Sequence, residues 1–403
     1  MSEWADRTHT VFNIKPSKSS AVLFTRLTGE LYPHCPPLAL SGHTLPYEVT
    51  YKYLGLTLDA GLKWYEHAKT AIGKAIGTSA QISRIVHRSR AFSVHTVATL
   101  IRTILIPRCT YASQFWKFNV VTYRKLDSAA VRPLKRALGL YWNTHHLSIM
   151  VECDILSTKR YVLLFGQNYI SRAINNPSNP STRAVSEHAR ALASDEKLNS
   201  SLPHSFVFSR KAMTAAAALS ADTDIKAKSK LKADQTTELL TAKWGSSLRC
   251  AMPVGFVMGK QHHIATESLS AAQTRAKFRF DTISPWRDYA KSIHRNPALA
   301  VCKWCHTTVA RASHFIHCTG LLRIRRVRTT IAACKRTINS KLNSHKHRKK
   351  QSFVQTILSG HHPLLDTKAN ADLMRDSLTA LRQLLIAVKS HAINSHLPND
   401  AAQ

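Results

Sequence analysis

Acidic residues are scarce in this sequence. Its 403 residues include 57 lysines and arginines but only 23 aspartates and glutamates, which gives a formal net charge of +34 at pH 7. No acidic residue occurs between Asp288 and Asp366. Such an excess repels itself in a compact fold unless a polyanion screens it. Nucleic acid is the expected partner, because every phosphate contact releases counterions. An anionic membrane surface is the alternative.

Long apolar segments are also missing. No uninterrupted apolar stretch approaches the length that spans a bilayer, and no amphipathic helix or lipid anchor is evident, so no membrane partner is expected. The opening residues MSEWADRTHTVF lack the apolar core of a signal peptide. Of the eight cysteines, five are scattered and three are clustered, which favours metal binding over a disulfide framework. The sequence therefore predicts an intracellular protein.

The clustered cysteines form a metal-binding pattern. The segment CKWCHTTVARASHFIHC has the spacing C-x2-C-x8-H-x3-C, with Cys302, Cys305, His314 and Cys318 as ligands. Three thiolates and one imidazole suit a single structural Zn²⁺ in tetrahedral coordination. His306 and His317 are competing ligands, and His314 is favoured because His317 directly precedes Cys318. The alternative is a buried thiol cluster without metal.

Aromatic and basic residues accompany this motif. Trp304 and Phe315 either stack on unpaired bases or fill the small core that a metal domain needs. The basic residues after the motif predict phosphate contacts, the alternative being a solvated helix face: they are Arg323, Arg325, Arg326, Arg328, Lys335 and Arg336. The run HKHRKK at 345–350 fits a nuclear-import signal, so a nuclear location is expected.

Hydrophobic periodicity predicts an α+β fold that passes into a mostly α fold. Strands are expected at 20–24, 38–40 and 51–58, with Gly55 marking a bulge or a close backbone approach in the last. Helices are expected at 65–85, at 94–105 with a stop at Pro107, at 126–138 with a kink or break at Pro133, and at 161–170. A seam from Met374 to Val388 predicts a helix packed on its own domain.

Several motifs resemble those of non-LTR retrotransposon (LINE-type) reverse transcriptases. These are FNIKPSKSSAVLF, then KYLGLTLDAGLKWYEH, then IRTILIPRCTYASQFW, and finally the Cys-Cys-His-Cys segment. The resemblance implies the end of a palm with a residual β-sheet, a primer-grip hairpin, a helical thumb and a small zinc knuckle with a basic helical tail. It further implies RNA and DNA as partners. The contacts implied near the N-terminus are Lys15, Lys18, Lys52, Tyr53 and Gly55.

On this resemblance the expected organisation has five parts. Residues 1–61 are a partial palm and hairpin, 62–175 the thumb, 176–295 a polar linker and helical region of unknown role, 296–350 the knuckle and basic segment, and 351–403 the C-terminal helices.

The chain departs from that family in its catalytic residues. Polymerisation needs paired carboxylates that hold two Mg²⁺ ions, and the sequence contains no Asp-Asp pair. Asp195-Glu196 lies in a polar context that does not suit such a site. We therefore expect no polymerase activity from this chain alone, with Mg²⁺ confined to an intact parent polymerase and an N-terminal half missing. The alternatives are a non-enzymatic zinc-knuckle protein that binds RNA or DNA, and the decayed fragment of an element.

Overall fold

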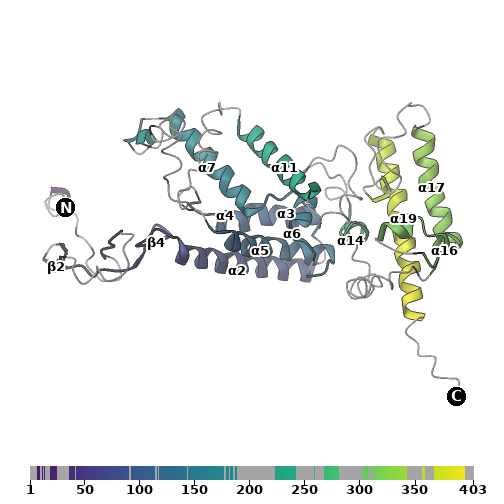
Figure 1. Cartoon of the computed structure of the whole chain (residues 1–403), viewed down its shortest axis with the longest axis horizontal. Helices are drawn as coiled ribbons and strands as arrows, with labels where there is room; N and C mark the ends of the chain where they lie inside the picture. The colour runs from purple at the N-terminus through teal and green to yellow at the C-terminus, as the bar shows by residue number, and fades with distance from the viewer. Residues whose placement is uncertain are drawn as a thin grey trace, which may run out of the picture. The chain divides into compact units, whose positions relative to one another are not determined.

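The computed structural model describes about two thirds of the chain in detail and shows a mostly helical protein with two small antiparallel sheets (Figure 1). The described residues are 7–9, 11, 13, 19–24, 36–40, 42–89, 92–113, 116, 118–142, 144–176, 178–180, 182–184, 187, 223–241, 258, 267–280, 302, 304–307, 312–342, 356–358 and 367–394. The chain forms two compact units. Unit 1 comprises Met1–Gly77, Pro107–Leu126 and Thr158–Ile225, and unit 2 comprises Thr78–Ile106, Asp127–Ser157 and Lys226–Gln403.

Both sheets of unit 1 are two-stranded hairpins. Strands β1 (Ala39–Leu40) and β2 (His43–Thr44) pair across a turn with Gly42 at φ 79°, as the Ser-Gly sequence predicts. Strands β3 (Thr50–Tyr53) and β4 (Leu56–Asp59) pair with Tyr51 opposite Leu58. The expected single strand over 51–58 is therefore wrong. A two-residue turn leaves the alternation of the flanking residues unbroken, so periodicity alone does not reveal it.

The predicted strand at 20–24 is reduced to one bridge. Ala21 pairs in parallel with Tyr47: its N–H donates to the carbonyl of Pro46 at 2.9 Å, and its carbonyl accepts from the N–H of Glu48 at 2.9 Å. The residues at 20–24 favour a strand, but propensity alone does not form one without a neighbouring strand to pair with.

An aromatic cluster forms much of the described core of unit 1. Trp116 is fully buried, and its ring stacks on Phe118 with centroids 3.8 Å apart. The indole N–H of Trp116 donates to the carbonyl of Tyr111 at 3.0 Å. His67, on α2 (Tyr65–Ser89), packs on the same ring with centroids 5.8 Å apart. The long helix predicted for 65–85 is thus confirmed. The helix predicted at 161–170 is also confirmed, as α7 (Thr158–Asn175).

The chain passes through Pro107 without ending its helical course. Helix α3 (Val94–Leu100) leads into a π-helical turn, η2 (Ile101–Leu105), and then into α4 (Ile106–Cys109). The stop predicted at Pro107 is wrong. Proline is tolerated here because the π turn directly before it replaces the regular α-helical hydrogen-bond ladder that its missing N–H would otherwise interrupt. Ile106 closes the π turn by donating its N–H to the carbonyl of Ile101.

Helix α5 (Val120–Leu138) contains Pro133 but remains one helix, so the predicted break does not occur. It ends at Gly139, as predicted. Gly139 has φ 63°, and the next N–H, that of Leu140, donates to the carbonyl of Lys135 at 2.8 Å. This pattern is a Schellman motif, which only glycine adopts without strain. Helix α6 (His146–Glu152) follows and was not predicted.

Polar contacts fix helix α11 (Thr223–Thr241) within unit 2. The buried Gln235 amide accepts the N–H of Ser157 at 2.8 Å and donates to the carbonyl of Ile155 at 2.8 Å. Lys232 pairs with Asp154 at 2.6 Å. A buried amide that is satisfied on both sides specifies one register for the helix that carries it.

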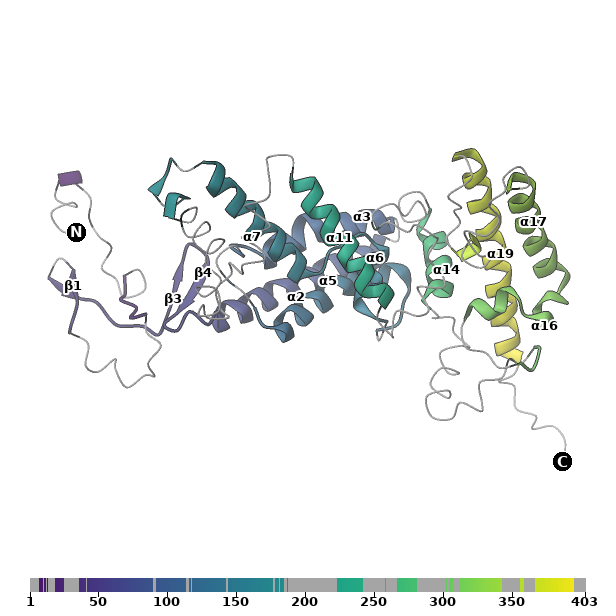
Figure 2. The same cartoon turned by 45° about the horizontal axis from the view of Figure 1, so that its top comes forward.

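The C-terminal part of unit 2 packs around two long helices. Helix α17 (Arg325–Leu342) lies beside α19 (Thr367–Asn394), and α14 (Leu269–Arg279) also contacts α19 (Figures 1 and 2). The predicted packing of the C-terminal helix on its own domain is confirmed. Leu381 and Val388 of the predicted seam are buried, whereas Met374, Leu378 and Leu385 are half-buried. The buried stripe comprises Leu373, Ser377, Ala380, Leu381, Leu384 and Val388.

Two buried arginines of α14 hold this part of unit 2 together. Arg275 pairs with Glu267 and donates to the carbonyl of Ile357 at 2.9 Å. Arg279 pairs with Glu152 of α6 at 2.7 Å, with both side chains about 1% exposed. Buried charges of this kind are tolerated only when paired. Among the described helices, none has the length and apolar character needed to cross a bilayer.

Candidate metal centre and basic surface

A tight turn brings the first two cysteines of the motif to the same side of the backbone. The N–H of His306 donates to the carbonyl of Cys302 at 2.7 Å, and the N–H of Cys302 donates to the carbonyl of Thr307 at 2.7 Å. His306 adopts a left-handed φ of 57°. The side chain of Cys305 contacts the hydroxyl of Thr307 at 2.9 Å. The alternative ligand His306 therefore contributes its backbone N–H and its left-handed conformation to this turn.

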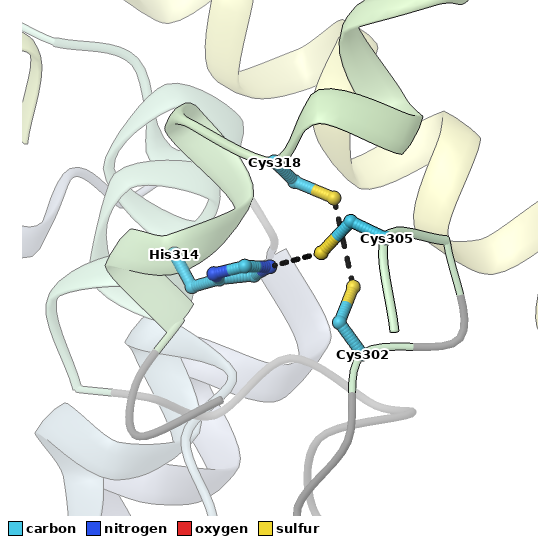
Figure 3. A group of neighbouring side chains, drawn as sticks. All are labelled: Cys302, Cys305, His314 and Cys318. Carbon is cyan, nitrogen blue, oxygen red and sulfur yellow. Dashed lines mark hydrogen bonds between the residues drawn. The ribbon is translucent and has the colours of Figure 1, made fainter. Parts of the chain in front are cut away.

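The other two ligands come from short helical elements. His314 lies in the 3₁₀ helix η5 (Ala312–Ile316), and Cys318 caps the start of α16 (Thr319–Leu322). All four ligand atoms of Cys302, Cys305, His314 and Cys318 lie within 4.8 Å of one another (Figure 3). The structure therefore groups the four residues that the spacing favoured, and the alternative His317 is not among them.

The interatomic distances in this cluster suit one tetrahedral ion. The Sγ atoms of Cys302 and Cys318 are 3.5 Å apart, and the Sγ of Cys305 is 3.3 Å from Nε2 of His314 (Figure 3). Zinc–sulfur bonds of about 2.3 Å and zinc–nitrogen bonds of about 2.0 Å place tetrahedral ligand atoms roughly 3.5–3.8 Å apart. The group could hold one metal ion after small adjustments of these side chains.

Burial and close packing shift the pKa values of three groups in the cluster. Burial and, after it, the neighbouring thiols raise the pKa of Cys318 to about 12. For Cys305, desolvation opposes ionisation, but hydrogen bonds from Thr307 and from the other thiols lower its pKa to about 7. Burial, aided by His317, lowers the pKa of His314, which keeps the imidazole in the neutral form that binds metals. A bound dication ionises coordinating thiols outright.

The cluster stands on a hydrophobic core that it shares with the basic helix. Phe315, Cys302 and Cys318 are buried together with Val327 and Ile331 of α17. Because Phe315 is only 3% exposed, its place is in this core and not on a base. Trp304 is half-buried against the same core, and its ring meets that of Phe315 edge-on at 5.7 Å.

A missed residue, Gly320, explains how the two halves of the motif approach each other. A Cβ atom on Gly320 would lie 2.0 Å from the carbonyl oxygen of Trp304. Only glycine fits at this position. The sequence did contain a signal for this contact, because Gly320 lies two residues after Cys318, the last cysteine of the ligand pattern. A glycine next to a ligand pattern often marks a close approach of two backbone segments.

The basic residues after the motif form an exposed surface on α17 and on the turn before it. This basic surface consists of Arg323, Arg325, Arg326, Arg328, Lys335 and Arg336, all exposed. The opposite face of α17 buries Val327, Ile331 and Cys334 in the shared core. Within the part of the chain that the structure describes, no ion pair involves any of the five arginines.

The structure describes only some of the residues near the N-terminus that were expected to contact nucleic acid. Lys15 and Lys18 lie outside the described residues, as does 345–350. Lys52 and Tyr53 are exposed on β3, beside the turn at Leu54 and Gly55.

Tyr111 fixes the turn at Leu54 and Gly55. Its hydroxyl donates to the carbonyl of Leu54 at 2.8 Å. A Cβ atom on Gly55 would meet the Tyr111 ring at 3.2 Å. The space over Gly55 is thus occupied by this side chain, a contact that the sequence did not reveal.

Asp59 and His67 have structural roles. The carboxylate of Asp59 accepts the N–H groups of Lys63 at 2.8 Å and Trp64 at 2.6 Å, just before α2 begins. His67 is only 3% exposed, because the aromatic cluster covers it. Burial and then Lys74 lower its pKa. Its neutral ring accepts from the N–H of Thr57 at 3.4 Å.

Comparison with known proteins gives one distant relationship. The chain is 25% identical over 178 residues to an RNA-directed DNA polymerase from the mobile element jockey of Drosophila melanogaster. The match covers 44% of this chain and 19% of that protein, so this chain spans about a fifth of the relative's length. No protein-family model matches the chain. No solved structure matches it either.

Proposed function

We propose that this chain is the nucleic-acid-binding C-terminal portion of a non-LTR retrotransposon reverse transcriptase and that it binds RNA and DNA in the nucleus. The β3–β4 hairpin would be the primer grip, the helices from α2 to α7 the thumb, and residues 302–318 a zinc knuckle. The distant relationship to a mobile-element polymerase supports this reading, as does the formal net charge of +34.

One observation carries the proposal: a ligand cluster and an arginine-rich surface share a single small core. Cys302 and Cys318 are packed with Val327 on the buried face of α17, while the basic surface lies on the exposed face. A metal at the cluster would fix the turn from which that surface begins, because Cys318 caps α16 and Arg323 ends it. A fixed backbone at this turn would reduce the entropy lost when the arginines contact phosphates.

The metal itself is the first test. We expect one Zn²⁺ per chain, bound by the three cysteines and His314, since this donor set selects zinc over harder ions. Metal analysis of the purified full chain measures the stoichiometry. Cys305→Ser should lose the ion. Cys334→Ala, which changes a buried cysteine of α17 outside the cluster, should retain it. Full zinc content in Cys305→Ser would overturn the assignment.

The basic surface is the second test. If each phosphate contact contributes about 0.9 to the salt slope, replacing Arg323, Arg325, Arg326 and Arg328 with Gln should flatten the slope for duplex DNA by about 2–4. The control variant combines Lys69→Gln and Arg375→Gln, which remove charges already paired with carboxylates, and it should leave the slope nearly unchanged. Salt titrations by fluorescence anisotropy measure both.

An unchanged slope in the arginine variant would show that this surface is a solvated helix face. Contacts by Lys335, Arg336 and Trp304 remain proposals of the same kind. Trp304→Ala removes the ring, so a loss confined to single strands is the expected result, whereas Trp304→Phe keeps the half-buried aromatic packing and should retain most of the affinity.

A further inference from the structure

A strongly exposed tryptophan lies far from the metal cluster in the sequence. Trp142, in the turn between α5 and α6, is 81% exposed, more than any other aromatic side chain that the structure describes. An exposed indole forgoes a large hydrophobic stabilisation. An exposed ring of this size is therefore a candidate contact for a ligand.

The backbone around Trp142 is fixed on both sides. The ammonium of the buried Lys135 donates to the carbonyl of Trp142 at 2.5 Å. Gly139 reverses the chain in its left-handed conformation, and the N–H of Thr144 donates to the carbonyl of Tyr141 at 3.2 Å. The turn is thus held in one conformation with its indole outward. Preorganisation of this kind reduces the entropy lost on binding.

The charges near this turn favour an anionic ligand. Arg136 is exposed on the last turn of α5. The Cε of Lys277, from α14, lies 3.9 Å from the position of a Cβ on Gly139. Lys135 lies behind the turn, and burial lowers its pKa to about 8. The opposing acid is Glu238, which interacts with His145. An aromatic face with cations beside it matches the way proteins bind single-stranded nucleic acid.

We propose that Trp142 is a stacking platform for an unpaired nucleotide base, with Arg136 and Lys277 contacting the adjoining phosphates. The proposal rests on the proposed nucleic-acid function and adds to it a site outside the metal cluster and its basic surface. A single strand is favoured over a duplex because only an unpaired base exposes both faces to an aromatic ring.

The test compares a 20-nucleotide oligo(dT) with a duplex of equal length at constant salt. Alanine substitution at a stacking position weakens single-strand binding by about 5- to 150-fold, and this is the loss expected for Trp142→Ala, with duplex binding unchanged. Trp142→Phe should retain most of the affinity. Ile386→Ala removes another exposed apolar side chain, 60% exposed on α19, and should change neither.

The outcomes separate the two proposals. If Trp142→Ala binds both substrates like the wild type while the arginine variant of the basic surface is weakened, the stacking site is refuted and the proposed function stands. An equal loss on both substrates would also refute stacking. A change in self-association, measured by sedimentation, would make this turn a protein interface instead. If the wild-type chain binds neither substrate, the proposed function itself fails.

Discussion

Gly320→Ala should damage the metal centre without touching a ligand. An ideal Cβ on Gly320 would lie 2.0 Å from the oxygen of Trp304 and 2.4 Å from its carbonyl carbon. Ordinary carbon–oxygen contacts are about 3.2 Å or longer, so the two segments must separate by roughly 1 Å. Trp304 lies between Cys302 and Cys305, and Gly320 lies two residues after Cys318. The separation therefore pulls the ligand pairs apart.

The magnitude follows from this displacement. Overpacking in a well-packed core costs about 1–3 kcal/mol, and metal–ligand distances tolerate only about 0.2 Å of error. Zinc binds only the folded knuckle, so a destabilisation of that fold lowers the affinity for zinc by the same free energy. Zinc binding should therefore weaken by about 5- to 150-fold. Competition with a chromophoric chelator measures the affinity, and circular dichroism checks that the helices remain.

Gly77→Ala is the matched control. Gly77 is exposed on α2, and no atom lies within 4 Å of its added Cβ. Removing a glycine from a helix interior should stabilise the protein by about 0.5–1 kcal/mol, with zinc affinity unchanged. If Gly320→Ala instead binds zinc as tightly as the wild type does, the close approach of Gly320 to Trp304 is not part of the metal centre and the reasoning fails.

Three other variants test separate features. Burial and then nearby positive charge lower the pKa of His146 to about 4. As the pH falls below about 6.5, the unfolded chain therefore binds the proton first, and the wild-type protein loses stability. In urea unfolding, the stability of His146→Gln should fall by about 1–2 kcal/mol less than that of the wild type between pH 7 and pH 5. Equal losses would contradict this. Glu152→Gln should lower the free energy of unfolding by about 3–5 kcal/mol, because it leaves Arg279 buried without its charge partner. The double variant Glu152→Leu/Arg279→Met should recover most of this lost stability. A single variant as stable as the wild type would refute the buried pair. Gly55→Ala should lower the free energy of unfolding by about 1–3 kcal/mol, because Gly55 has a φ of 86° and a 3.2 Å contact with the Tyr111 ring. Gly42→Ala should lower it by less, because φ is 79° but the space is open. Equal losses of stability would show that crowding at Gly55 adds nothing.

The residue spacing in the sequence was sufficient to predict which four side chains group into a possible metal site, and most of the helices. Ligand spacing in Cys302–Cys318 is local, so a turn and two short helical elements bring the four groups together wherever the rest of the chain lies. The long helices have a period that periodicity detects directly, and Gly139 ends α5 because left-handed backbone favours glycine. The excess of positive charge is likewise a property of composition alone.

Other features depended on contacts between distant segments. The hairpin turn at Leu54 and Gly55 keeps the alternation of a single strand, so periodicity missed it, although the family resemblance implied a hairpin; the pairing of β3 with β4 shows it. Pro107 continues a helical course because a π turn precedes it, which no local propensity indicates. Whether a residue such as His67 or Trp142 is buried or exposed is decided by what packs beside it. The sequence therefore determined the excess of positive charge and the local spacing of the possible metal ligands. Tertiary packing decided which side chains face solvent, because burial depends on neighbours that are remote in the chain.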